Sequence, residues 1–191
     1  MAENFTIGSY LTFLDSELDQ VINEARQNFT GLSEDQFNWK ANGKEWSVAQ
    51  CLEHMRMNGI SFIPVFDKVL REEHSSEEYL NLPYSNGFLG KRAIRIIGPE
   101  NTRKFKTTKK FSPQLSNYTL TALEDFISLQ EVLKDYVSKS SSYNIKKIKV
   151  AMPAFEIFRL SMGDMLNFII AHEKRHIKQA TLIMKMTGFP S

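Results

Sequence analysis

The chain has 191 residues, of which 42% are hydrophobic and 24% are charged, as in an ordinary folded domain. This length and composition predict a single domain over residues 1–191 with a substantial core. The net charge of +2 argues against a general nucleic-acid coat, and no apolar stretch is long enough to span a bilayer, so no membrane partner is expected. The N-terminus lacks the pattern of a signal peptide. The single cysteine, Cys51, excludes an intrachain disulfide and predicts a cytoplasmic location.

The first half of the chain carries two helical patterns. Apolar residues in steps of three and four predict a helix over residues 7–29. Residues 28–44 are expected to form a loop or a short turn. A second helix should begin at Ser47, because Ser47 and Gln50 form a capping box that satisfies backbone donors of the first turn. The apolar pattern resumes beyond Pro64, which predicts a kink there rather than a helix end.

The segment from residue 74 to residue 113 has no helical periodicity and is interrupted by glycine and proline. Only a short strand at residues 94–97 is indicated. Residues 90–110 hold eight lysines and arginines against one acid, Glu100, for a charge of +7, which leaves about −5 for the rest of the chain. A loop of this length in a compact domain is often functional.

Two further helices are predicted in the second half. One spans residues 115–138, and the last begins near Ser161, where Ser161 and Asp164 form a second capping box. Gly188, followed by Pro190, is a normal stop signal. Four long amphipathic helices with hardly any strand pattern predict an all-α four-helix bundle. The long connection between the second and third helices would cross the bundle's length, so that these helices run parallel.

Residues 172–176 read His-Glu-Lys-Arg-His, and this string carries the chemistry of the last helix. His172 and His176 lie four apart on the core-facing stripe, where two imidazoles need partners and can bind one metal ion. The string also matches the zinc-protease pattern, in which Glu173 would be the general base. Fifteen residues follow His176 without another Asp, Glu or His. A third protein ligand must therefore come from upstream, which disfavours a protease.

His54 is the candidate third ligand. It lies about 10 Å along the second helix, and His176 lies about 16 Å from the far end of the last helix, at ~1.5 Å per residue. Antiparallel packing of the two helices would bring the histidines to a comparable depth. Three histidines would then share one ion and leave a fourth position for water or substrate. His74, in a highly charged stretch, is expected to be a solvated helix end.

These motifs resemble those of a known family. Residues 46–54, Trp-Ser-Val-Ala-Gln-Cys-Leu-Glu-His, resemble the W-S-x-x-[EQ]-x-L-x-H segment of the DinB/YfiT-like superfamily. Residues 171–179 resemble its closing H-x-x-x-H-x-x-Q, and residues 38–40 resemble its pattern before the second helix. The likeness covers nearly the whole chain in order and spacing, with a looser match in the middle loop.

The resemblance implies a helical bundle that holds one divalent ion, commonly zinc or nickel, on His54, His172 and His176. Family members with known activity include S-transferases that use low-molecular-weight thiols and a thiol-dependent isomerase. Many members are dimers, so a homodimer is expected here, with a low-molecular-weight thiol as a co-substrate.

Other side chains near the motifs have two interpretations each. Glu173 lies about 100° around the helix from His172. It is either a catalytic base or a hydrogen-bond partner of a metal-binding histidine, or else a solvated charge on the helix surface. Gln179 shares the face of His176 and either hydrogen-bonds a ligand or the substrate, or is an amide near the bundle end. Cys51 is expected to be a small buried hydrophobe rather than a nucleophile. Trp46 is expected to pack against the bundle end rather than to line a pocket.

The basic segment also has two interpretations. The favoured one is a solvated, mobile connector. In the alternative, Lys91, Arg92 and Arg95 recognise a carboxylate or phosphate of an anionic substrate or thiol cofactor. Nucleic acid is a weaker candidate, because no stacking platform is interleaved with the basic residues.

The sequence thus predicts a metal-dependent transferase or hydrolase acting on a small molecule. The alternative is a non-catalytic metal-binding or ligand-binding module of a stress response, and a zinc peptidase is the weakest candidate. The fourth metal position distinguishes the first two, because exchangeable water favours catalysis and a fourth protein ligand favours a structural role.

Overall fold

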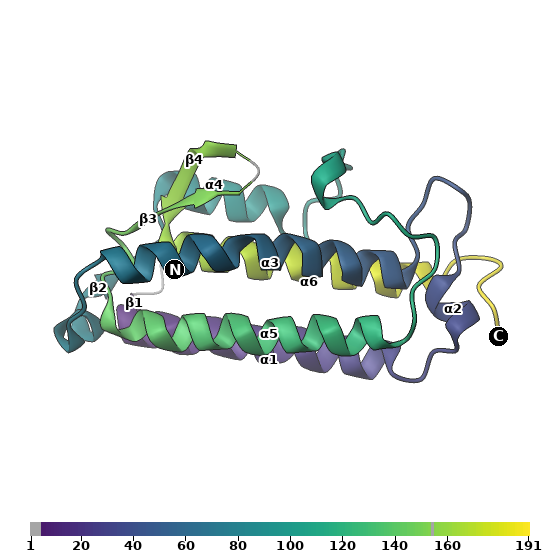
Figure 1. Cartoon of the computed structure of the whole chain (residues 1–191), viewed down its shortest axis with the longest axis horizontal. Coiled ribbons are helices and arrows are strands. Elements are labelled where there is room, and N and C mark those ends of the chain that lie inside the picture. The colour runs from purple at the N-terminus through teal and green to yellow at the C-terminus, as the bar shows by residue number, and fades with distance from the viewer. Residues whose placement is uncertain (1–4, 154) are drawn as a thin grey trace.

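Four long helices form the body of the computed structural model, which describes residues 5–153 and 155–191 (Figure 1). They are α1 (Ile7–Phe29), α3 (Val48–Glu72), α5 (Thr121–Lys139) and α6 (Met162–Ile183). α1 and α3 each pack against both α5 and α6, so the four helices surround one hydrophobic core. In the described part of the chain, no helix is both long enough and apolar enough to cross a membrane.

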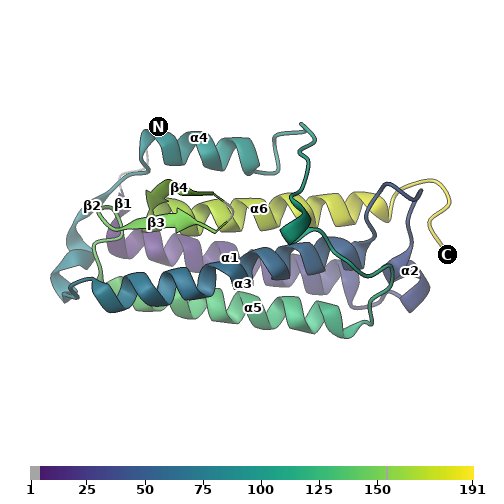
Figure 2. The ribbon, with the colours of Figure 1, turned by 45° about the horizontal axis from the view of Figure 1, so that its top comes forward.

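Short elements cover the ends and one side of these helices (Figure 2). They are β1 (Phe5–Thr6), α2 (Glu34–Asn38), β2 (Pro83–Tyr84), α4 (Phe88–Ile97), β3 (Lys149–Met152) and β4 (Phe155–Ser161), with 3₁₀ turns at Glu77–Asn81, Lys109–Phe111 and Ser140–Ser142. β1 pairs antiparallel with β2, and β3 pairs antiparallel with β4. α4 packs on α6, and the β3–β4 hairpin lies beside it.

α3 and α5 run in the same direction. Near their starts, the Gln50 side chain donates to the carbonyl of Leu115 over 2.9 Å. Near their far ends, the Tyr136 hydroxyl donates to Asp67. The connection between the two helices therefore returns the chain to the end where α3 began. Along the way it supplies α4 and the residues that cover the site described below.

Two predicted helix boundaries are corrected. The third long helix begins at Thr121 rather than at residue 115, because side chains from other elements bind the preceding backbone. Gln50 binds the Leu115 carbonyl, and the Asn38 side chain both donates to the Tyr118 carbonyl and accepts from its amide. The last helix ends at Ile183, and turns continue to Gly188, whose φ of 88° lies in the left-handed region.

The predicted strand at residues 94–97 is wrong. These residues form the last turn of α4, where Ala93 and Ile97 lie one turn apart and the Ile94 carbonyl accepts from the Gly98 amide. The β3–β4 hairpin was not expected from the sequence. Val150 and Leu160 pair across it and are buried, but β4 begins with exposed side chains and lacks the alternation that marks a half-buried strand.

Asp164 fixes the start of α4 against α6. The Ser161 hydroxyl accepts from the Asp164 amide over 3.2 Å, as the capping pattern predicts. The Asp164 carboxylate, however, accepts from the Tyr84 hydroxyl (3.2 Å), the Asn86 amide (2.7 Å) and the Gly87 backbone N–H (3.1 Å). A buried carboxylate with three donors binds the connection firmly to the last helix.

Gly90→Ala should therefore destabilise the protein. A Cβ at Gly90 would lie 2.2 Å from the Asp164 Cγ, so α4 or the carboxylate must shift. We expect a loss of about 1–3 kcal/mol in the free energy of unfolding, measured by urea denaturation. Gly43→Ala is the matched control, since its Cβ would meet nothing within 4 Å, and its effect should stay within about 0.5 kcal/mol. Equal effects of the two substitutions would contradict close packing at Gly90.

Candidate metal centre

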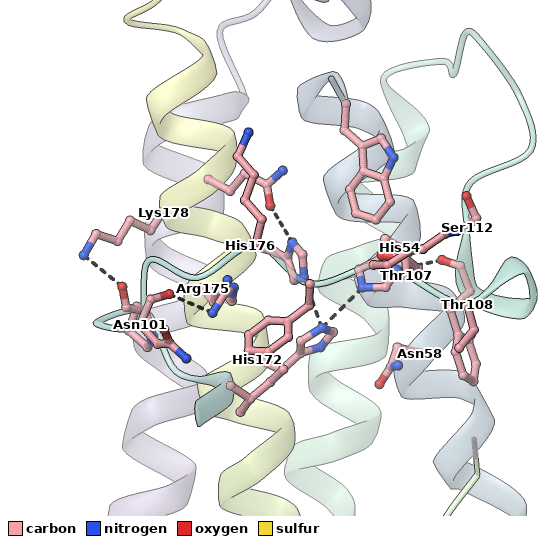
Figure 3. Close-up of a pocket in the computed structure, with 18 of the residues that line it drawn as sticks. His54, Asn58, Asn101, Thr107, Thr108, Ser112, His172, Arg175, His176 and Lys178 are labelled. Atoms are coloured by element: carbon pink, nitrogen blue, oxygen red, sulfur yellow. Dashed lines mark hydrogen bonds between the residues drawn. The ribbon is translucent and has the colours of Figure 1, made fainter. Parts of the chain in front are cut away.

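Three buried histidines from two helices converge on one point (Figure 3). His172 and His176 come from α6, and His54 comes from α3. The Nε2 atom of His172 lies 3.0 Å from that of His176 and 3.3 Å from that of His54. Two nitrogens bound at about 2.0–2.1 Å to one tetrahedral ion are about 3.3 Å apart, so the spacing fits a zinc-sized ion. Three histidine ligand atoms within 4.8 Å of one another are a suitable donor set for a divalent metal.

Hydrogen bonds orient two of the rings. The Nδ1 atom of His54 lies 2.6 Å from the Phe111 carbonyl, which only accepts, so Nδ1 carries the proton. The Nδ1 atom of His176 donates to the Gln179 side-chain oxygen over 2.9 Å. In a neutral imidazole the other nitrogen is then a bare acceptor. Both rings therefore turn an unprotonated Nε2 toward His172, in the manner of metal-ligating histidines with an outer hydrogen-bond partner.

Burial keeps the three imidazoles neutral. Desolvation lowers the pKa of His54, lowers the pKa of His172 well below its usual 6.5, and lowers the pKa of His176 to about 3. Mutual repulsion adds to the shift, since neighbouring histidines also disfavour the charge on His172 and on His176. Neutral imidazole is the form that binds a metal ion.

A cavity of about 780 Å³ opens beside the histidines. The ring of Trp46 lies 4.8 Å from that of His54 and 5.9 Å from that of His176, between ring centroids. Trp46 lines the cavity, which corrects the expectation that it packs only against the bundle end. The polar side chains that also line it include Asn58, Thr107, Thr108 and Ser112 (Figure 3).

The segment of residues 99–112, which we call the strap, crosses this site from α6 to α3. On α6, Arg175 donates to the backbone carbonyls of Asn101, over 2.8 Å, and of Arg103. At its other end the strap supplies the Phe111 carbonyl that holds His54. The strap is mostly exposed, as the sequence favoured for this segment, and it is also bound to both helices that provide the histidines. Arg175 was missed, although its place three residues after His172 puts it on a neighbouring face.

Of the two expected catalytic residues, Gln179 lies at the cavity and Glu173 does not. Gln179 lines the cavity and binds His176. Glu173 is buried and accepts from the Gln130 side chain of α5 over 3.1 Å, across the core. Its second oxygen has no hydrogen-bond partner within the described residues, and burial raises its pKa to about 8. A zinc peptidase needs this carboxylate beside the metal, and the geometry does not provide it there.

The expected anion-binding residues lie away from the cavity. Lys91, Arg92 and Arg95 are exposed on α4, and none is among the described residues that line the cavity. Cations from other elements line it instead: Lys44, Lys104, Lys106, Arg175 and Lys178.

Cys51 lies one turn before His54 on α3 and is fully buried. Burial raises the pKa of its thiol, so the thiol stays protonated and unreactive. It behaves as the small hydrophobe that the sequence predicts.

A family model described as the DinB superfamily matches residues 17–180. The match covers most of the chain and includes all three histidines, so the chain belongs to the DinB superfamily. Comparison with curated proteins and with solved structures gave no match.

The neutral histidines predict a pH-dependent stability for the metal-free protein. The folded state resists protonation of His172, whereas the unfolded chain takes up that proton near pH 6.5, so stability is lost as the pH falls below 6.5. His172→Asn should make this loss shallower, by up to about 1.4 kcal/mol per pH unit in the free energy of unfolding, measured by denaturant titrations in the presence of a chelator.

Leu166→Ala controls for destabilisation alone, because it removes buried apolar contacts of the same helix without changing a titratable group. This variant should be less stable with an unchanged slope. Parallel slopes for wild type and His172→Asn would show that His172 is not held neutral.

Proposed function

We propose that the chain is a metal-dependent enzyme, a transferase or hydrolase of the thiol S-transferase type, that works on a small molecule in the cavity. The observation that carries the proposal is the convergence of three neutral imidazoles beside an open cavity of about 780 Å³. His54, His172 and His176 would hold one divalent ion, zinc or nickel by the donor set. The fourth side of the site faces the cavity, which suits an exchangeable ligand.

When bound, such an ion lowers the pKa of a thiol or water at its open position and makes it nucleophilic. The chain's own residues prepare the site. The Phe111 carbonyl and the Gln179 side chain fix the tautomers of His54 and His176. Trp46 and the strap form part of the cavity wall beside the histidines. The proposal therefore gives Gln179 a positioning role and gives Glu173, which binds Gln130 of α5, no part in the cavity.

The same proposal includes the family's topology and a cytoplasmic location. The shared direction of α3 and α5 supports a single-domain four-helix bundle with a long crossover between its second and third helices. The core is continuous across the four long helices, which supports one domain. The buried free thiol of Cys51 suits a reducing compartment.

Metal content tests the site. We expect untagged wild-type protein to carry close to one divalent ion per chain, by elemental analysis after purification or after dialysis with zinc or nickel. His54→Ala should lower the metal affinity at least about tenfold, because it removes a ligand on one helix only. His74→Ala, at an exposed position beyond α3, should bind like wild type. Wild type that binds no metal when zinc and nickel are offered would overturn the metal site.

Activity then separates an enzyme from a binding module. Metal-loaded wild type should accelerate the conjugation of cysteine to 1-chloro-2,4-dinitrobenzene over the uncatalysed rate, and His54→Ala should not. Water proton relaxation with bound Mn²⁺ or Co²⁺ reports whether the open position exchanges solvent. A stoichiometric metal without an exchangeable position would favour the non-catalytic module.

We also propose that the protein is a homodimer that buries apolar side chains of α4 and β4. Phe88 and Leu89 on α4 are 80% and 57% exposed, and Ile157 on β4 is fully exposed. These two elements contact each other, so their exposed apolar side chains belong to neighbouring parts of the surface.

Ile157→Asp should therefore convert a dimer to a monomer in light scattering coupled to gel filtration, because a charge at the interface core is costly to bury. Leu115→Asp, at an exposed apolar position before α5, is the matched control and should remain dimeric. A monomeric wild type, or a dimer in both variants, would refute this interface.

A further inference from the structure

We propose that Arg175 is the specificity residue of the cavity and binds a carboxylate, phosphate or sulfonate group on the substrate. This inference rests on the proposed function, because it places the oxyanion in the same cavity as the open metal position. Arg175 lies three residues after His172 and one before His176 on α6, and it lines the same cavity (Figure 3).

The side chains that line the cavity carry mostly positive charge. Its described lining includes five lysine and arginine side chains and one acid, Glu45. Glu45 is paired with Lys104 over 3.3 Å, in an exposed position. The ion pairs within residues 5–153 and 155–191 do not include Arg175. A guanidinium that lines an open cavity and has no carboxylate partner among these ion pairs favours an anion from solution.

Arg175 also has donors left for a ligand. A guanidinium carries five N–H groups, and the carbonyls of Asn101 and Arg103 use two of them. These two bonds, with the Phe105 ring 5.0 Å from the guanidinium carbon, hold the side chain in place. The group is therefore positioned in advance, which lowers the entropy lost when an oxyanion binds. Backbone carbonyls leave its positive charge uncompensated.

The rest of the cavity suits an apolar body between the metal and the anion. Phe62, Phe168 and Ile183 line it alongside the histidines. A ligand with a metal-binding atom, a short apolar linker and an oxyanion would match all three parts. The hydroxyls of Thr107 and Thr108, from the strap, are further donors within the cavity.

Two matched ligand pairs test the proposal. The first compares 3-mercaptopropionate with uncharged 2-mercaptoethanol on Co²⁺-loaded protein, followed by the cobalt–thiolate absorption band. The second needs no metal and compares 8-anilinonaphthalene-1-sulfonate with N-phenyl-1-naphthylamine, which has the same rings without the sulfonate, by fluorescence. We expect wild type to prefer the anionic member of each pair. Arg175→Gln should reduce that preference about tenfold or more and leave the affinity for the neutral member nearly unchanged.

Lys91→Gln removes an exposed cation of α4 outside the cavity and should keep the wild-type preference. Added salt should weaken the preference in wild type more than in Arg175→Gln. Equal losses for charged and neutral ligands in Arg175→Gln would show that Arg175 only holds the strap, and would overturn the proposal. An unchanged preference in both pairs would do the same. If neither thiol produces the cobalt band, the open metal position fails, and the fluorescent pair still decides the role of Arg175.

Discussion

The site depends on one constraint, which is that three neutral imidazoles face one another inside the protein, two of them with an unprotonated Nε2. The Nε2 atom of His172 lies 3.0 Å from that of His176 and 3.3 Å from that of His54, and a single N–H on His172 cannot fully satisfy both buried acceptors. Burial disfavours a second proton on these rings, as the lowered pKa values of His54, His172 and His176 indicate. A metal ion bound by all three Nε2 atoms would satisfy both acceptors and would join α3 to α6. The arrangement is costly as packing and makes sense as a binding site.

The rest of the fold holds this arrangement in register. The capping box of Ser47 and Gln50 fixes where α3 begins and so sets the depth of His54. Gln50 also holds the Leu115 carbonyl, which ties the end of the long connection to the start of α3. Asp164 fixes the beginning of that connection on α6. Between these two anchors the strap is brought over the histidines, where its carbonyls orient His54 and hold Arg175.

Much of the helical fold follows from local pattern. The helix over residues 7–29 begins where the periodicity predicts, and α3 begins where the capping box at Ser47 predicts. Each of these signals is local, because it involves residues close together in the chain. The start of α5 and the β3–β4 hairpin could not be predicted from local pattern. The backbone before Thr121 is bound by Asn38 and Gln50, about 65–80 residues away in the chain. β4 lacks alternation because part of it is exposed.

By itself the sequence determined the mostly helical class, the superfamily and the three histidines as candidate ligands. The helical class was predicted from the spacing of apolar residues, and the superfamily and the candidate ligands were predicted from short motifs. Only the tertiary structure decided which charged groups share the cavity. The exposed surface of α4 carries Lys91, Arg92 and Arg95. The cavity is lined instead by Arg175 and by residues of the strap. The reason is that contacts with Asp164 and α6 determine how the long connection folds. Glu173 lies inside the expected motif, yet it points across the core to Gln130, because the direction of a side chain depends on which helices surround it.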